Sequence, residues 1–195
     1  MKNLKFLFVI LFGFQNPSSN ANGLLTTPID PFQVDTFSLG EWIVKSNAIG
    51  PITIGSSLSS ISGYLKTFQL RQMPSYELGF DGEEMMDVYF FKGEMAFALM
   101  FNEENRLLSS IIVLHKDLKT SNGIGVGSTA SEIIKACPDT EFLMNLMMGT
   151  EYCESKNCGF TFEFSESVCD YDNGEDMPGK PVRTSVSPVR MYLKN

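Results

Sequence analysis

A short pattern occurs twice in this chain of 195 residues, first at 52–61 and again at 124–133. The first copy reads Ile-Thr-Ile-Gly-Ser-Ser-Leu-Ser-Ser-Ile and the second reads Ile-Gly-Val-Gly-Ser-Thr-Ala-Ser-Glu-Ile. A pattern that returns within one chain is typical of a structural unit used twice. We therefore expect two related units, one over 47–120 and one over 121–195.

Each copy of the pattern predicts a turn followed by a helix. Gly55 and Gly127 supply the turns, and Ser57 and Thr129 follow at equivalent places, where a hydroxyl can cap a helix N-terminus. Glu132 completes a capping box with Thr129. The predicted buried faces are Leu58, Ile61, Leu65 and Phe68 in the first helix and Ala130, Ile133, Ile134 and Cys137 in the second.

Strand-like segments follow each helix. In the first half they are Tyr76–Phe80, Met86–Phe91, Met95–Phe101 and Leu107–His115, separated by turn residues such as Lys92-Gly93. In the second half weaker counterparts lie at 142–148, 150–153, 159–164 and 182–193. Short loops favour antiparallel neighbours. The predicted fold is α+β, with two tandem helix-plus-antiparallel-meander repeats whose helices pack on one face of the sheet.

The N-terminus, residues 1–21, has the parts of a secretory signal peptide. Lys2 and Lys5 precede an apolar run, Phe6–Phe14, which is too short to span a bilayer, and small residues follow up to Ala21. We expect cleavage there, export to the periplasm or beyond, and no membrane insertion of the mature chain.

Residues 22–46 separate the expected signal peptide from the first repeat. They hold Pro28 and Pro31 and few regularly spaced apolar residues. This composition predicts an irregular N-terminal arm that ends in a short strand at Trp42–Val44.

The net charge of the chain is −8. Binding to phosphate backbones requires clustered Lys and Arg, and the sequence has no basic stripe. The charge therefore argues against a nucleic-acid partner and leaves a basic partner open.

All four cysteines lie in the second half, at 137, 153, 158 and 169. In an exported chain an even number favours disulfides. Cys153 and Cys158 bracket a polar loop between two predicted strands, which favours a bridge between them and leaves Cys137 with Cys169. A four-thiolate zinc site is the alternative, although no paired C-x-x-C motif is present.

The pattern of a turn with Gly-Ser-[Ser/Thr], a helix and an antiparallel sheet, duplicated at Ile52–Ile61 and Ile124–Ile133, resembles the β-lactamase-inhibitor-protein-like (BLIP-like) fold. A single unit is similar to the outer-membrane assembly lipoproteins of the SmpA/OmlA type. The resemblance implies a module that binds another protein with one sheet face and has no catalytic residues.

Catalytic motifs are absent from the sequence. His115 is the only histidine, and no serine lies in a Gly-x-Ser-x-Gly or Ser-x-x-Lys motif. We interpret His115 as a solvated strand end and the chain as a non-enzyme.

The acidic segment Asp170–Asp176 offers an alternative. Oxygen ligands that alternate around a glycine suit Ca²⁺, and Asp170, Asp172 and Asp176 are the candidate ligands. The spacing departs from an EF-hand loop, so a solvated acidic loop competes with the calcium interpretation, and no other cofactor is expected. The alternative function is thus an enzyme or a calcium-dependent protein that uses this loop.

The two central strands of the first half are apolar on both faces. Strand alternation places Val88, Phe90, Met95, Phe97 and Leu99 on one face and Tyr89, Phe91, Ala96, Ala98 and Met100 on the other. The helices cover one face, so the second is covered by the arm or is a partner surface.

We therefore predict an exported, non-catalytic protein-binding module, an inhibitor or an envelope-assembly factor. It would bind an envelope or extracellular protein through an aromatic and Met-rich sheet face that includes Tyr89, Phe91 and Met100.

Overall fold

The computed structural model describes residues 37–171 and 178–194. The expected signal peptide and the first part of the expected arm lie outside these ranges. The last part of the arm begins with a 3-10 turn, Leu39–Glu41. It continues into strand β1 (Ile43–Lys45), one residue from the strand predicted at Trp42–Val44.

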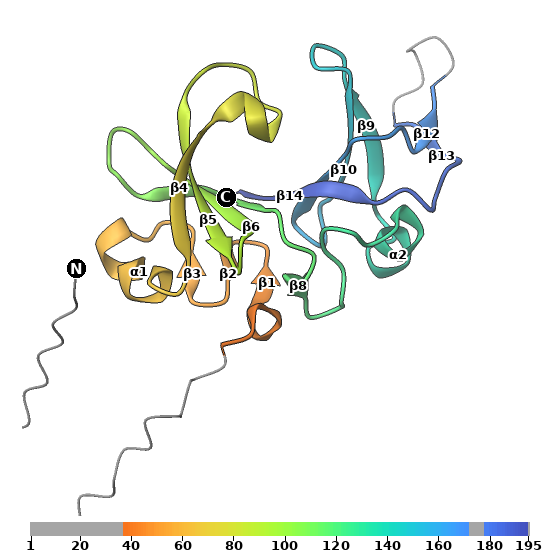
Figure 1. Cartoon of the computed structure of the whole chain (residues 1–195). Helices are drawn as coiled ribbons and strands as arrows, with labels where there is room; N and C mark the ends of the chain where they lie inside the picture. Colours follow the sequence, from red (N-terminus) through yellow and green to blue (C-terminus); the bar gives the residue numbers. More distant parts are fainter. Residues whose placement is uncertain (1–36, 172–177, 195) are drawn as a thin grey trace, which may run out of the picture. The chain divides into compact units, whose positions relative to one another are not determined.

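Eight antiparallel strands form the main sheet (Figure 1). Tight turns join several neighbours; at Lys92-Gly93 both residues have positive φ, 52° and 89°, which suits a two-residue hairpin turn. In spatial order the strands are β4 (Gln69–Pro74), β5 (Met85–Phe91), β6 (Glu94–Phe101), β7 (Leu108–Val113), β14 (Pro188–Lys194), β11 (Phe160–Phe164), β10 (Thr150–Ser155) and β9 (Glu141–Asn145).

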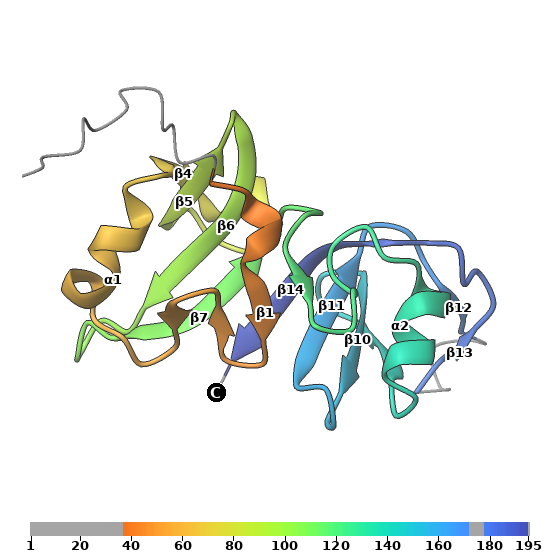
Figure 2. The ribbon, with the colours of Figure 1, turned by 90° about the horizontal axis from the view of Figure 1, so that it is seen from below.

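A second layer covers one side of this sheet. It contains helices α1 (Leu58–Leu65) and α2 (Ala130–Ala136) and a four-stranded sheet in the order β3 (Ile52–Thr53), β2 (Ala48–Ile49), β1 and β8 (Lys119–Thr120). Figures 1 and 2 show both helices and these short strands on the same side of the main sheet. A two-stranded ribbon, β12 (Cys169–Asp170) with β13 (Lys180–Pro181), lies beside α2.

Both helices begin where the sequence predicts. The Ser57 hydroxyl accepts from the Ser60 N–H at 3.3 Å, and the Thr129 hydroxyl accepts from the Glu132 N–H at 3.2 Å. The Glu132 carboxylate accepts in return from the Thr129 N–H at 2.7 Å, so the predicted capping box is confirmed. α2 ends just before Pro138, which cannot continue a helix.

The two halves of the main sheet follow the two helices in the same order. A glycine with positive φ, Gly55 at 90° and Gly127 at 79°, precedes each helix. α1 is followed by β4 to β7, and α2 by β9, β10, β11 and, after the ribbon, β14. The structure confirms the predicted mixed α+β class, with mostly antiparallel strands.

The strand predicted at Tyr76–Phe80 is wrong. Residues Ser75–Leu78 form a 3-10 turn that Gly79 closes with a φ of 78°. The true partner of β5 is β4, which the sequence hides because its residues Gln69–Gln72 are exposed and mostly polar. β4 therefore lacks the alternation of apolar and polar residues that would predict a strand.

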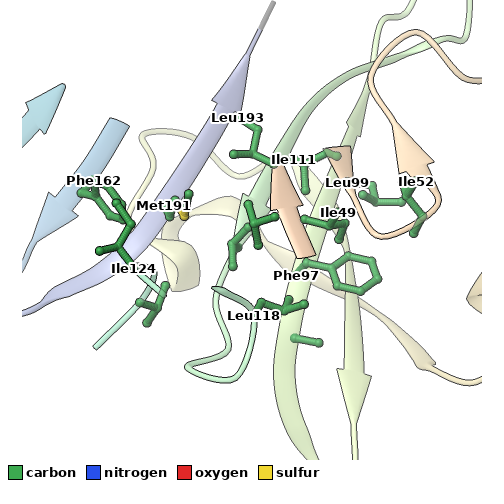
Figure 3. Packing of buried hydrophobic residues seen from close by; sticks show 14 of the residues in the cluster. Ile49, Ile52, Phe97, Leu99, Ile111, Leu118, Ile124, Phe162, Met191 and Leu193 are labelled. Atoms are coloured by element: carbon green, nitrogen blue, oxygen red, sulfur yellow. The ribbon is translucent and has the colours of Figure 1, made fainter. Parts of the chain in front are cut away.

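The larger of two core clusters lies between the two layers and contains residues from both halves of the main sheet. Cross-strand pairing sets Phe162 beside Met191 and Leu193 beside Ile111, so apolar side chains from both halves meet at β14 (Figure 3). From the covering layer, Ile61 and Ile133 are 2% and 1% exposed and pack into this same cluster. Both helices therefore stabilise one core.

The disulfide joins Cys137 to Cys158, with an S–S distance of 2.04 Å. The predicted pairs Cys153–Cys158 and Cys137–Cys169 are both wrong. On β10, Cys153 faces Phe162 across the ladder, whereas Cys158 lies in the hairpin loop beyond the strand. The loop brings Cys158 to the C-terminus of α2, where Cys137 ends the helix. Cys153 and Cys169 remain as buried thiols.

Thr129→Ala tests the capping box. Loss of the hydroxyl leaves an N–H of the first turn without its partner, and we expect the free energy of unfolding to fall by about 1 kcal/mol. Urea denaturation measures it. Thr129→Ser, which keeps the hydroxyl, serves as the control and should be close to the unchanged protein.

Candidate functional site

The candidate site is the face of the main sheet opposite the helices. Residues paired across neighbouring strands extend this face over the β7–β14 pairing, where the two halves meet. Ile112 faces Tyr192, Tyr192 faces Thr161, and Thr161 faces Glu154. A second row sets Arg190 beside Glu163 and Glu163 beside Tyr152. These side chains share one surface because partners in an antiparallel ladder point to the same face.

Two loops wall this surface into a groove of about 730 Å³. From the first half, Phe80 packs edge-on against Tyr192 at 6.0 Å. From the second half, the β9–β10 hairpin contributes Leu146 and Met147, which are 67% and 92% exposed. The groove is lined by Phe80, Met100, Ser110, Ile112, Met144, Asn145, Leu146, Met147, Thr150, Tyr152, Glu154, Thr161, Glu163 and Tyr192.

The hairpin that carries Leu146 and Met147 has a defined conformation. The Asn145 side-chain oxygen accepts from the backbone N–H groups of Met147 and Met148, at 3.1 and 3.3 Å. Gly149, with a φ of 64°, closes the turn by donating to the Asn145 carbonyl. The two apolar side chains are therefore exposed on an ordered turn.

A buried ion pair forms the floor of the groove. The Arg190 Nη2 donates to the Glu163 carboxylate at 2.6 Å, and the two side chains are 15% and 12% exposed. The Tyr192 hydroxyl donates to the other Glu163 oxygen. Burial first, and then this hydrogen bond, raise the pKa of Tyr192, so that the phenol stays protonated as a donor.

Gly79 makes room for this pair. Its φ of 78° lies in the left-handed region, and a Cβ there would come within 2.6 Å of the Arg190 Nη2. The guanidinium therefore rests against the backbone of the first half while it bonds to Glu163 of the second half. Arg190 thus ties the two walls of the groove together.

One end of the groove is acidic. Glu154 on β10 faces Glu141 on β9, so two carboxylates lie directly opposite each other. Within 37–171 and 178–194, neither of them forms a salt bridge. Like charges at facing positions are unfavourable in a sheet, and a cation held between them would relieve the repulsion.

The three predicted partner-binding residues do not share a surface. Met100 lines the groove and is 38% exposed. Tyr89 is 3% exposed under the covering layer, where burial raises its pKa to about 12, and Phe91 packs against Phe37 on that same side. The predicted common surface is therefore wrong: Tyr89 is buried, and the half-buried Phe91 lies on the face opposite Met100.

A β-bulge causes this error. Phe90 faces Met95, but Tyr89 faces Phe97, so Ala96 is an extra residue on β6. Beyond the bulge the register shifts by one, which exchanges the faces of one strand relative to the other. Tyr89 therefore stacks on Phe97 in the core, at 5.2 Å.

The sequence patterns do not predict most of the residues that line the groove. Tyr152 and Tyr192 lie on segments with only weak strand patterns, and the strand predicted at 142–148 includes Leu146 and Met147, which instead lie in the turn after β9. The signal for that turn was Gly149 with Asn145 just before the two apolar residues.

His115 is also placed differently from the prediction. It is 8% exposed rather than solvated, and its Nδ1 accepts from the Asp117 N–H at 3.1 Å. Its Nε2 lies 3.0 Å from the Glu94 carboxylate. The residue fastens the β7–β8 connection to β6.

The calcium prediction falls largely on residues outside the described ranges, since Asp172 and Asp176 lie there. Asp170 is exposed on β12, opposite Lys180. Among the residues that the structure describes, no group of three or more His, Cys, Asp or Glu side chains is arranged to hold a metal ion. In the same part of the chain, no helix has the length and apolar character needed to cross a membrane.

Glu163→Ala tests the floor of the groove. The change leaves the Arg190 guanidinium buried without its counter-charge, and we expect the free energy of unfolding to fall by about 3–5 kcal/mol. Chemical denaturation checks this value. Glu154→Gln, on the same sheet face but outside any salt bridge, is the matched control and should change stability by less than about 0.5 kcal/mol.

Comparison with known proteins gives a structural neighbour. No protein-family model matches the sequence, and no curated protein matches it. The structure is similar to the crystal structure of the uncharacterized protein YfeY from Escherichia coli, with a TM-score of 0.52 and 12% sequence identity. The similarity covers 78% of this chain and 99% of YfeY, so the two share a fold.

Proposed function

We propose that this chain is an exported, non-catalytic protein-binding module, either an inhibitor or an envelope-assembly factor. Its groove would receive a segment of an envelope or extracellular protein that carries both apolar and basic side chains. The observation that carries this proposal is the groove itself, in which exposed apolar side chains flank a floor formed by the Arg190–Glu163 ion pair.

The β9–β10 turn supplies the exposed apolar side chains of the groove. Met147 is 92% exposed on a turn that Asn145 and Gly149 hold in place. An ordered turn that presents methionine and leucine to solvent is unfavourable in isolation and is typical of adaptable binding surfaces. Tyr152 and Tyr192 add aromatic rings, the residue type enriched among binding hot spots.

Glu141 and Glu154 supply the negative charge at one end of the groove. These two residues face each other across the ladder with no salt bridge to any residue that the structure describes, and the chain has a net charge of −8. A Lys or Arg side chain of a partner would be attracted to this end of the groove. The apolar side chains beside it would then bury the stem of that cation.

The architecture of two tandem units supports the location of the groove. We propose that 47–120 and 121–195 are the two copies of one BLIP-like unit, because each brings a capped helix and a group of antiparallel strands. The copies join edge to edge at β7 and β14, and the groove lies over that joint. The Cys137–Cys158 disulfide supports export to an oxidising compartment.

Removal of the acidic pair tests whether these charges serve binding or stability. The variant Glu141→Gln with Glu154→Gln loses a repulsion between facing carboxylates, and we expect it to gain a few tenths of a kcal/mol in free energy of unfolding at low salt. Denaturation at low and high salt measures this, since screening should erase the gain. A loss of stability would show that the carboxylates support the fold.

A random peptide library displayed on phage tests the partner chemistry. Panning against the purified full chain should enrich sequences that combine Lys or Arg with aromatic or large aliphatic residues. Alanine at both Leu146 and Met147 should weaken the binding of a selected peptide by roughly 10- to 100-fold in fluorescence anisotropy, because both apolar contacts are lost.

Tyr64→Ala is the matched control, since Tyr64 is 50% exposed on α1, on the opposite side of the sheet. It should leave peptide binding unchanged. Enrichment of acidic peptides, or equal losses in both variants, would contradict the proposed groove partner.

A further inference from the structure

We propose that Cys153 and Cys169 form a second disulfide, which fastens the β12–β13 ribbon to the inner face of β10. Both residues are left over when Cys137 bonds to Cys158, and they are 0% and 3% exposed within the same core cluster. This inference is independent of the proposed groove partner.

The buried Glu151 carboxylate holds the backbone of Cys169 close to the strand that carries Cys153. Glu151 precedes Cys153 by two residues on β10, so both side chains point to the covered face of the sheet. The Glu151 carboxylate accepts from the backbone N–H groups of Val168 and Cys169, at 3.0 and 3.1 Å. The backbone of Cys169 is therefore held over the face that carries Cys153.

A second set of contacts, through Phe142 and Gly179, also connects Cys153 to Cys169. Phe142 on β9 directly faces Cys153 on β10, and the Phe142 carbonyl accepts from the Gly179 N–H at 2.7 Å. A Cβ at Gly179 would lie 2.9 Å from the Cβ of Cys169. The immediate neighbour of Cys153 thus bonds to the residue against which Cys169 packs.

The surroundings determine when the bond forms. Burial raises the pKa of both thiols, that of Cys169 to about 12, and the nearby Glu151 carboxylate adds to the effect. The thiolate is the attacking species, so the folded site reacts slowly. The bond forms while the ribbon is open, during folding, and is then protected from reduction.

The reaction needs a disulfide as the oxidant. The thiolate of one cysteine attacks a disulfide donor, such as oxidised glutathione or the disulfide of a thiol oxidoreductase, and releases one donor thiolate. The second cysteine then attacks the mixed disulfide and releases the other donor thiolate. Two protein thiols are oxidised, and one donor disulfide is reduced to two thiols.

Such a bond would also brace the groove. Tyr152 and Glu154, which flank Cys153 in the chain, line the groove on the opposite face of β10. The disulfide would hold β10 in place from the covered face of the sheet. It would close the loop between β10 and β12 and so restrict the unfolded chain.

Peptide mapping of the full chain tests the pairing. The protein is refolded in glutathione buffer, alkylated, and digested without reduction. We expect a cross-linked peptide pair that contains Cys153 and Cys169, together with the Cys137–Cys158 pair and no alkylated cysteine. Alkylated Cys153 and Cys169, or a Cys153–Cys158 pair, would overturn the proposal.

A thermal measurement tests the bond in the folded protein. The variant Cys137→Ala with Cys158→Ala, unfolded and then refolded in a strong reductant, should melt roughly 6–12 °C lower than the same variant refolded in glutathione buffer, because the remaining bridge is lost. A variant with all four cysteines changed to alanine is the control and should not respond. An equal response of both variants would overturn the proposal.

Discussion

The pairing of β7 with β14 is the contact on which the rest of the structure depends. It is antiparallel and sets Val113 beside Met191 and Ile112 beside Tyr192. Because side chains alternate along a strand, this one register sends Met191 into the core and Tyr192 to the opposite face. A shift of one residue would bury the tyrosine hydroxyl and expose the methionine, so core and groove are specified together.

That register also explains why polar side chains are tolerated in the floor of the groove, close to the β7–β14 pairing. Arg190 and Tyr192 both leave β14 on the groove side, and both bond to Glu163 of β11. The pair is nearly desolvated, so its net contribution to stability is small, but each partner without the other would be costly. The network therefore favours one relative placement of β14 and β11 over neighbouring registers.

The sequence predicts the parts of this fold that depend on local chemistry. The capping residues Ser57 and Thr129 and the class of the fold all follow from short-range patterns. The groove does not, because it depends on pairing between distant strands and on the bulge at Ala96, which no local pattern announces. The cysteine pairing failed for a related reason: the Cys137–Cys158 bridge joins a helix end to a hairpin loop.

The groove residues that the sequence patterns do not reveal are those whose role depends on neighbours on other strands. Glu163 alone is a charge on a strand; beside Arg190 and Tyr192 it is the centre of a buried network. Gly79 alone is a turn residue, but a Cβ at this position, with its φ of 78°, would also press against the Arg190 guanidinium. Met100, the one predicted residue that does line the groove, lies on the face opposite Tyr89 because of the bulge. A groove built where two strands from different halves pair therefore depends on the register of that pairing, and the local patterns of either half predict only parts of it.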